Sequence, residues 1–177
     1  MASKAKQKGT GWELEICKFL GSTLGGNFQR VPNSGAFLGK SNSHRKSFMS
    51  VTQVRAGKGD IIPPDHLPKL NIEAKNYADI SFSQIINGNC KQLDNWIEQT
   101  EQPADDSDIS FTIFKITRKG SWVVFKESLQ DNFLLSSHVL YIKNESLPQE
   151  TRYIVTDHEK FFINNRDKII EIAAAIK

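Results

Sequence analysis

Three side chains that could carry out hydrolytic chemistry lie within one short stretch of the sequence, residues 58–76: Asp60, Glu73 and Lys75. The stretch is typical of two short strands joined by a proline-bounded turn. If the turn centres within residues 63–68, antiparallel pairing places Asp60 beside Glu73. Two carboxylates that close repel each other, so one stays protonated unless a cation joins them. A hard divalent ion with oxygen ligands resolves this conflict. The set then has the composition of a metal-dependent site for phosphodiester hydrolysis.

The second strand of this pair must hold the reactive side chains on one face and the core on the other. Because side chains alternate along a strand, Glu73 and Lys75 share a face. The apolar residues share the opposite face: Leu70, Ile72 and Ala74. Two simpler interpretations stay open. Glu73 and Lys75 could form an ordinary surface ion pair, and Asp60 could be a turn residue favoured by the glycines around it.

The composition indicates a single soluble domain. The chain has 177 residues, of which 38% are hydrophobic and 24% are charged, values typical of a globular protein. It contains no apolar run of the roughly 20 residues that span a bilayer and no signal peptide at its start. We therefore expect a cytoplasmic protein without membrane association. Cys17 and Cys90 have no paired spacing, which predicts free thiols. The glycines match no nucleotide-binding motif, so no nucleotide cofactor is expected.

Charge is distributed unevenly along the chain. The net charge is only +3, but no acidic residue occurs between Glu15 and Asp60. That interval is rich in basic residues: Lys18, Arg30, Lys40, Arg45, Lys46, Arg55 and Lys58. Such segregation builds one positive face, which is typical of a protein that binds the phosphate backbone of a nucleic acid. The alternative is a solvated basic surface with no partner.

The N-terminal part is predicted to begin with a flexible basic arm, residues 1–9. Thr10 and Glu13 match a capping box, and apolar residues follow at helical spacing, so a helix is expected over 10–24. Glu13 then borders the buried stripe, either as the capping acid alone or also as a site residue. A short strand over 27–32 leads into a long loop rich in Ser, Gly, Lys and Arg, and a loop of that length is either functional or mobile.

The remaining elements complete a single domain over residues 10–177. They are expected to be a helix over 83–100, a hairpin of strands over 109–117 and 121–125, weaker strands at 139–142 and 152–155, and a last helix capped by Asp157. This order predicts an α/β fold with a mixed central β-sheet flanked by helices and no internal repeat.

These motifs resemble the PD-(D/E)XK nuclease superfamily, and within it the archaeal-type Holliday junction resolvases. The matching residues appear in the family's order over about residues 8–100: Lys8-Gly9 with Glu13, Arg30 with Asn33-Ser34-Gly35, Gly59-Asp60-Ile61-Ile62, and Ile72-Glu73-Ala74-Lys75. The resemblance implies a restriction-endonuclease-like core. The loop before Asp60 and the chain after the hairpin are longer than in compact family members. The longer loop bears on the substrate geometry, and the dimer surface does not carry over from the family.

The resemblance also implies a metal site and a role for each residue in it. Asp60, Glu73 and the Ala74 carbonyl would bind Mg²⁺, with Mn²⁺ able to substitute, and waters would complete the octahedron. Glu13 would orient the attacking water or help to hold a second ion. Lys75 would lower the pKa of that water or stabilise the negative charge that develops at phosphorus.

The candidate DNA contacts come partly from the resemblance and partly from charge. Arg30 and Ser34 resemble the family's phosphate-contacting positions, although each is also an ordinary turn residue. Gln92 lies on the second predicted helix, where many superfamily members place a polar residue facing the metal, although an exposed glutamine is the simpler interpretation. The basic residues add further candidates: Lys8, Lys40, Arg45, Lys46, Arg55 and Lys58.

We therefore expect a metal-dependent, structure-selective DNA endonuclease. The specific expectation is a Holliday junction resolvase that acts on branched or double-stranded DNA as a homodimer, because a two-fold symmetric junction needs two active sites. One alternative is another nuclease of the superfamily, of restriction or end-processing type. The other is a catalytically silent DNA-binding module. The clustered acids argue against that module, because a purely binding protein gains nothing from acids beside phosphates.

Overall fold

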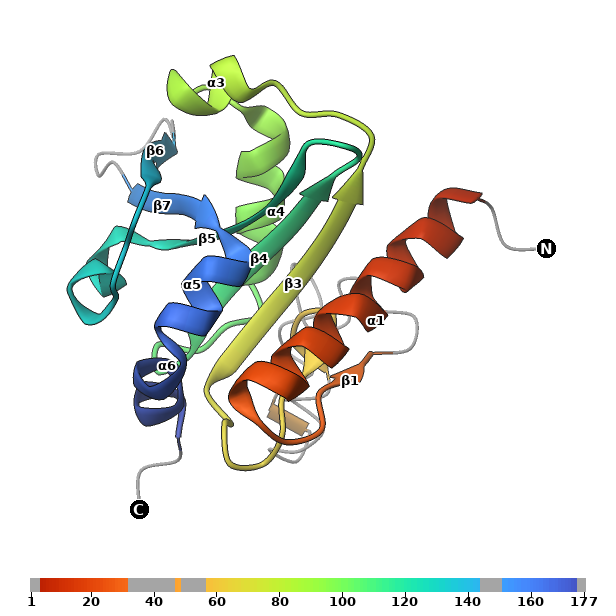
Figure 1. The fold of residues 1–177 in the computed structure, drawn as a ribbon, viewed down its shortest axis with the longest axis vertical. Coiled ribbons are helices and arrows are strands. Elements are labelled where there is room, and N and C mark those ends of the chain that lie inside the picture. Colours follow the sequence, from red (N-terminus) through yellow and green to blue (C-terminus); the bar gives the residue numbers. More distant parts are fainter. Residues whose placement is uncertain (1–3, 32–46, 49–56, 144–150, 175–177) are drawn as a thin grey trace.

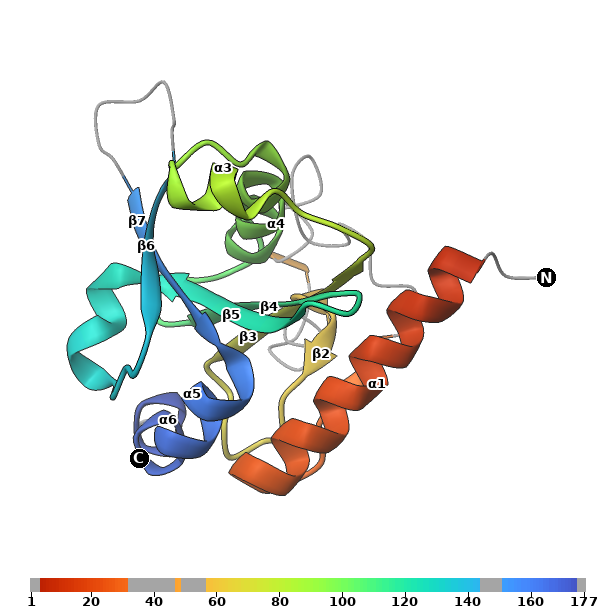
Figure 2. The same cartoon turned by 45° about the horizontal axis from the view of Figure 1, so that its top comes forward.

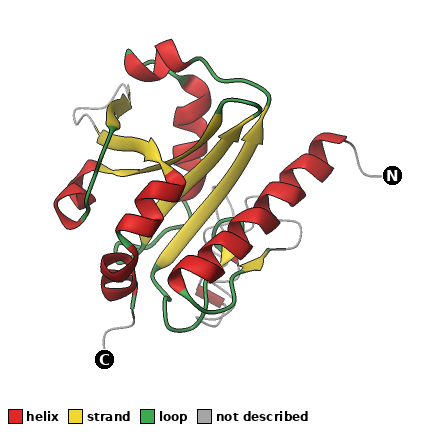
Figure 3. Cartoon of the chain, in the orientation of Figure 1, coloured by secondary structure: helices red, strands yellow, loops and turns green. Residues whose placement is uncertain are grey.

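The computed structural model describes residues 4–31, 47–48, 57–143 and 151–174 of the chain. Its helices are α1 (Lys4–Leu24), α3 (Phe82–Ile86), α4 (Lys91–Glu101), the 3₁₀-helix η2 (Glu127–Asn132), α5 (His158–Asn164) and α6 (Arg166–Ala173). Its strands are β1 (Gln29–Arg30), β2 (Ile61–Ile62), β3 (Leu70–Tyr77), β4 (Ile109–Ile116), β5 (Gly120–Lys126), β6 (His138–Lys143) and β7 (Thr151–Asp157). Figure 3 shows how these helices and strands are distributed over the molecule.

The described strands form one sheet in the order β1-β2-β3-β4-β5-β7-β6. β3 and β4 run parallel, with Leu70 opposite Ile109 and Tyr77 opposite Ile116. All the other neighbouring strands are antiparallel. The sheet is therefore mixed, which confirms the predicted α/β architecture with a restriction-endonuclease-like core. The β4–β5 hairpin and the β6–β7 pair also lie where the sequence predicted them.

Helices cover both faces of this sheet (Figures 1 and 2). One face packs against α1, α5 and α6 around a core that includes Ile16, Ile72 and Phe162. The other face packs against α3 and α4 around a second core that includes Trp96 and Tyr141. β3 contributes Leu70, Ile72 and Ala74 to the α1 core. The alternation along β3 therefore turns the residues between them toward α4, as the side-chain periodicity of a strand requires.

The first helix begins earlier than predicted. α1 starts at Lys4 rather than at residue 10, so the expected arm over 1–9 is largely helical and Thr10 is not its cap. Lysine, alanine and glutamine favour helices, and the added turns also contact the sheet. The Lys8 ammonium donates to the Thr117 hydroxyl, and the Asn76 amide donates to the Lys8 carbonyl over 3.2 Å. These contacts hold the extended helix along β3.

The helix predicted over 83–100 is in fact two helices, α3 and α4. Gly88 between them has φ +67°, a left-handed conformation that ends helices. A side chain there would also crowd the Ile142 carbonyl, 3.1 Å from an added Cβ. The positive φ and the close approach to β6 therefore both favour glycine here. The sequence alone does not show that Gly88 divides the predicted helix, because the contact with β6 is made by a segment far away in the sequence.

The C-terminal helix is also divided. Asp157 caps α5 as predicted, with its carboxylate accepting the Lys160 N–H at 2.8 Å. The helix then breaks at Asn165, whose side chain bonds both the N–H and the carbonyl of Leu134, at 2.6 and 3.0 Å. Cys17 and Cys90 are free thiols, as predicted, and both are buried. None of the helices in the described residues is long and apolar enough to cross a membrane.

Candidate active site

The β2–β3 hairpin brings Asp60 and Glu73 together. Ile61 pairs with Ile72 across the two antiparallel strands, and the Asp60 N–H donates to the Ile72 carbonyl at 2.9 Å. Asp60 therefore lies beside Glu73, as the sequence predicted. One oxygen of the Asp60 carboxylate, Oδ2, accepts the Ala74 N–H at 3.0 Å. This hydrogen bond fixes the carboxylate against the backbone of β3.

Gly59 allows the chain to approach β3 this closely. Its φ is +52°, and an added Cβ would lie 2.4 Å from the Ile72 carbonyl oxygen. Real Cβ atoms do not come that close to a backbone oxygen, and a left-handed residue with a side chain is strained. The glycine before Asp60 is thus required by the same contact that brings Asp60 to the site.

Burial and mutual repulsion dominate the electrostatics of the two acids. Asp60 and Glu73 are each only 7% exposed. Burial, together with the neighbouring Asp60 carboxylate, raises the pKa of Glu73 from 4.5 to about 7, while Lys75 partly opposes the shift. The two carboxyl groups are close enough to share a hydrogen bond. Near neutral pH Glu73 therefore keeps part of its proton, which a cation could replace.

Lys75 completes the group from the same strand. Its ammonium donates to Glu73 Oε1, and its side chain is 16% exposed. This confirms that Glu73 and Lys75 share a face of β3. Burial lowers the pKa of Lys75, but the nearby Glu73 and Asp60 carboxylates raise it by more, so the net shift is upward. Lys75 thus stays a cation at neutral pH, beside the acids.

The donors at this site fit a hard divalent cation. Asp60 Oδ2 is bonded to Ala74, which leaves Oδ1 and the Glu73 carboxylate as oxygen ligands. The N–H and carbonyl of one strand residue point to the same side, so the Ala74 carbonyl also faces Asp60. Oxygen donors of this kind suit Mg²⁺ or Mn²⁺. The pKa of Glu73 is raised by burial and by the Asp60 carboxylate, and such an ion would neutralise the two neighbouring acids.

Glu13 does not join these acids. Within the described residues, no group of three or more His, Cys, Asp or Glu side chains is gathered closely enough to hold a metal ion. α1 covers the opposite face of β3 from Glu73, which accounts for the separation. Glu13 instead accepts a hydrogen bond from the Arg30 guanidinium. The sequence predicted separate roles for these two residues and missed their pairing.

The other predicted DNA contacts have mixed outcomes. Ser34, Lys40, Arg45, Lys46 and Arg55 lie outside the described residues. Lys8 is half-buried and bonds Thr117. Gln92 is half-buried on α4, one turn before Trp96, whose ring lies 4.8 Å from that of Tyr77 at the end of β3. Its place on the helix that covers the Glu73 face is compatible with the predicted role, which stays a prediction.

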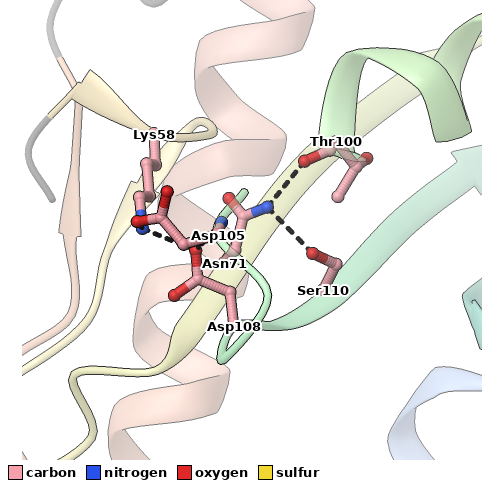
Figure 4. Close-up of polar contacts among 6 residues, drawn as sticks. All are labelled: Lys58, Asn71, Thr100, Asp105, Asp108 and Ser110. Atoms are coloured by element: carbon pink, nitrogen blue, oxygen red, sulfur yellow. Dashed lines mark hydrogen bonds and ion pairs between the residues drawn. The ribbon is translucent and has the colours of Figure 1, made fainter. Parts of the chain in front are cut away.

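Lys58 was predicted to contact DNA, and the structure gives it a different environment. It is 8% exposed, and its ammonium lies 2.7 Å from Asp105 Oδ2 and 2.5 Å from Asp108 Oδ2 (Figure 4). A buried ammonium held by two carboxylates does not present its charge to a phosphate. The structure therefore does not favour the predicted DNA contact of Lys58, which stays a prediction. Asp105 and Asp108 follow Lys58 by 47 and 50 residues. The only sequence signal for this pairing is the group of acidic residues in the loop that contains them.

An Asp, a Glu and a Lys on a buried hairpin of a mixed, helix-flanked sheet define the PD-(D/E)XK class of nucleases. The model of one family of that class, described as "Phage putative PDDEXK endonuclease", matches residues 4–171, and the chain belongs to this family. It is also similar to Protein D14 of Escherichia phage T5, with 26% identity over 152 residues that cover 82% of this chain and 86% of the relative. No solved structure matches the chain. The chain is thus a nuclease of the PD-(D/E)XK type, while the likeness to archaeal-type resolvases stays a prediction.

Proposed function

We propose that the chain is an endodeoxyribonuclease that depends on Mg²⁺, or on Mn²⁺ in its place, and hydrolyses phosphodiester bonds with water. The observation that carries this proposal is the buried Asp60–Glu73 pair with Lys75 beside it. A buried pair of acids that holds a proton near neutral pH is costly in a site with only a structural role. The same pair is an effective cation ligand.

Each residue then has a distinct task. Asp60, Glu73 and the Ala74 carbonyl would hold the ion, which when bound supplies Lewis-acid activation of water and neutralises charge on the phosphate. Lys75 stabilises the negative charge that develops on the phosphate oxygens as the water oxygen bonds to phosphorus and the bond to the leaving sugar oxygen breaks. The displacement is in line and forms no covalent intermediate with the enzyme. We propose that Glu13 pairs with Arg30 and so helps to arrange α1 and Arg30 around the DNA, rather than binding the ion.

Branched DNA is the proposed substrate, with a four-way junction as its specific form. The support is the resemblance carried by the Lys8, Arg30, Asp60 and Glu73 motifs, together with the acid-free basic interval before Asp60. Arg30 lies on the short edge strand of the described sheet, where its side chain is 24% exposed. A homodimer would supply the two active sites that paired nicks require. Because the similar Protein D14 comes from a phage of Escherichia, we place the activity in the cytoplasm of a bacterial host.

Cleavage assays on defined DNA test the proposal. The purified protein is incubated with a four-way junction, a linear duplex of matched sequence and single strands, in Mg²⁺ or in EDTA. Paired nicks at the junction that disappear in EDTA and in Asp60→Asn support the proposal. Asp167→Asn is the matched control, because Asp167 is 91% exposed on α6. Cutting of the linear duplex alone would replace the junction by a restriction or end-processing substrate. Binding without any cleavage would identify a silent DNA-binding module and overturn the proposal.

A further inference from the structure

Lys58 lies at the centre of a buried ionic cluster just before the hairpin. Its ammonium contacts Asp105 and Asp108, and the side chains of Lys58 and Asp108 are only 9% and 6% exposed. An ammonium beside two carboxylates is favoured in its charged form. A cation held by two carboxylates has little freedom to move, because leaving Asp108 would strand a buried charge.

The loop that carries these acids is itself firmly held. The Asp105 N–H donates to Asp108 Oδ2 at 2.7 Å, and the Asp108 N–H donates to the Asp105 carbonyl at 2.9 Å. The next residue, Ile109, donates its N–H to the Lys69 carbonyl at 2.7 Å, immediately before β3. The loop is therefore a fixed anchor at the start of the two parallel strands.

Asn71 joins the anchor to the same part of β3. Its amide nitrogen donates to the Thr100 carbonyl at 2.6 Å and to the Ser110 hydroxyl at 3.0 Å, which ties β3 to α4 and β4 (Figure 4). The side-chain oxygen of Asn71, Oδ1, would lie 3.1 Å from a Cβ added to Gly59. Gly59 is thus enclosed by the Asn71 side chain and the Ile72 backbone. Little space is left for the chain around Gly59 to shift.

Only Gly59 separates this cluster from Asp60. The chain is held on one side by the Lys58 ammonium and on the other by the hydrogen bond from the Asp60 N–H to Ile72. Gly59 has the greatest conformational freedom of any residue type, so the contacts on either side must supply the restraint. Of these two restraints, the one at Lys58 is an ion pair and the one at Asp60 is a backbone hydrogen bond.

We propose that Lys58, held by Asp105 and Asp108, is a positioning residue that fixes the Asp60 carboxylate for metal binding. This inference rests on the proposed metal-dependent function. It replaces the DNA contact predicted for Lys58 by a role that acts through Asp60. Residues that support metal ligands in this way change metal affinity by about 10- to 100-fold when they are substituted.

The direction in which each substitution changes the affinity for a divalent cation distinguishes a positioning role of Lys58 from a purely electrostatic effect of its charge. Removing the Lys58 cation would strengthen the binding of a divalent cation if charge alone mattered, and removing the Asp105 anion would weaken it. Under the positioning role, both Lys58→Met and Asp105→Asn release the chain before Asp60 and weaken binding. Asp105 is 53% exposed, so its substitution is compatible with folding even if Lys58→Met is not. Lys58→Arg keeps the ionic contact and restores part of the affinity.

The test is the dissociation constant of Mn²⁺, measured by isothermal titration calorimetry on the full chain without DNA, at pH 8. We expect about tenfold weaker binding for Lys58→Met and a smaller loss for Asp105→Asn. Lys168→Met should bind as the wild type does, because it breaks only an exposed ion pair on α6. Asp60→Asn should abolish binding, which confirms where the ion binds.

The outcomes distinguish this inference from the proposed function. If the wild type binds no Mn²⁺, the proposed function fails and the inference fails with it. If the wild type binds and Asp60→Asn does not, but Lys58→Met binds equally well or more tightly, only the positioning role is overturned. The same holds if the two substitutions shift affinity in opposite directions. A weaker salt dependence of DNA binding in Lys58→Met, with wild-type affinity for Mn²⁺, would restore the predicted phosphate contact.

Discussion

The raised pKa of Glu73 makes a quantitative prediction about stability in the absence of metal. Burial and the Asp60 carboxylate raise this pKa from 4.5 to about 7. Between these two values the folded state binds a proton that the unfolded state does not. Stability is therefore greatest below pH 4.5 as far as this group is concerned, and it falls as pH rises to about 7. The loss amounts to about 3 kcal/mol, from about 1.4 kcal/mol for each pH unit.

The measurement compares free energies of unfolding in urea, with EDTA present, from pH 5 to pH 8. Relative to Glu73→Gln, the wild type should lose about 2 to 3 kcal/mol over this range, because the variant cannot ionise. Glu98→Gln is the matched control. Glu98 is an exposed acid on α4 that accepts a hydrogen bond from Gln102 at 2.6 Å. Its substitution should leave the pH dependence of the wild type unchanged.

A parallel pH dependence in the wild type and in Glu73→Gln would refute the reasoning. It would mean that Glu73 is ionised throughout the range and that Lys75 alone neutralises it. Repeating the series with saturating Mg²⁺ adds a second check. A bound ion favours the ionised form, so the pH dependence specific to the wild type should shrink. If it did not, the acid pair would not be the binding site for the ion.

Three further predictions concern the hairpin. Mg²⁺ should raise the melting temperature more at pH 8 than at pH 5.5, because the proton on Glu73 competes with the ion at the lower pH. Asp60→Asn should abolish the shift, and equal shifts at both pH values would contradict this prediction. Lys75→Met should retain Mn²⁺ binding but slow single-turnover cleavage by about 100-fold or more; an unchanged rate would exclude Lys75 from catalysis. Gly59→Ala should lower the free energy of unfolding by about 2 kcal/mol or more, because of its positive φ and the Ile72 carbonyl. Gly11→Ala, in open space on α1, should match or exceed wild-type stability, and equal effects of the two would argue against the predicted clash.

The parts of the site that depend on local pattern were predictable from the sequence. Alternation along β3 separates Glu73 and Lys75 from the apolar residues, and a short turn leaves little choice in how Asp60 pairs with β3. The cap at Asp157 is also a local signal, since the side chain bonds a backbone N–H three residues later. Each of these features is decided within a short stretch of sequence, the longest being the hairpin that joins Asp60 to Glu73.

The features that the sequence did not predict depend on contacts between distant segments. Lys58 lies within a basic interval, and nothing near it in sequence shows that Asp105 and Asp108 fold back onto it. Likewise, Glu13 and Arg30 were assigned separate roles because their pairing needs β1 to lie beside α1. A charged residue is therefore a poor guide to a charged surface until its partners are known.

The acid pair also shows why stability and function are opposed in this hairpin. Without metal, Asp60 and Glu73 share a buried space that favours one proton over two negative charges. A carboxamide in place of Glu73 would remove that conflict, so Glu73→Gln is expected to be more stable at pH 8 than the wild type and yet unable to hold the ion. Proteins commonly keep such local conflicts at functional sites and offset them elsewhere in the fold. Here the surrounding contacts include the Asp60 bonds to β3 and the buried ion pairs of Lys58, which hold the two acids together against their repulsion.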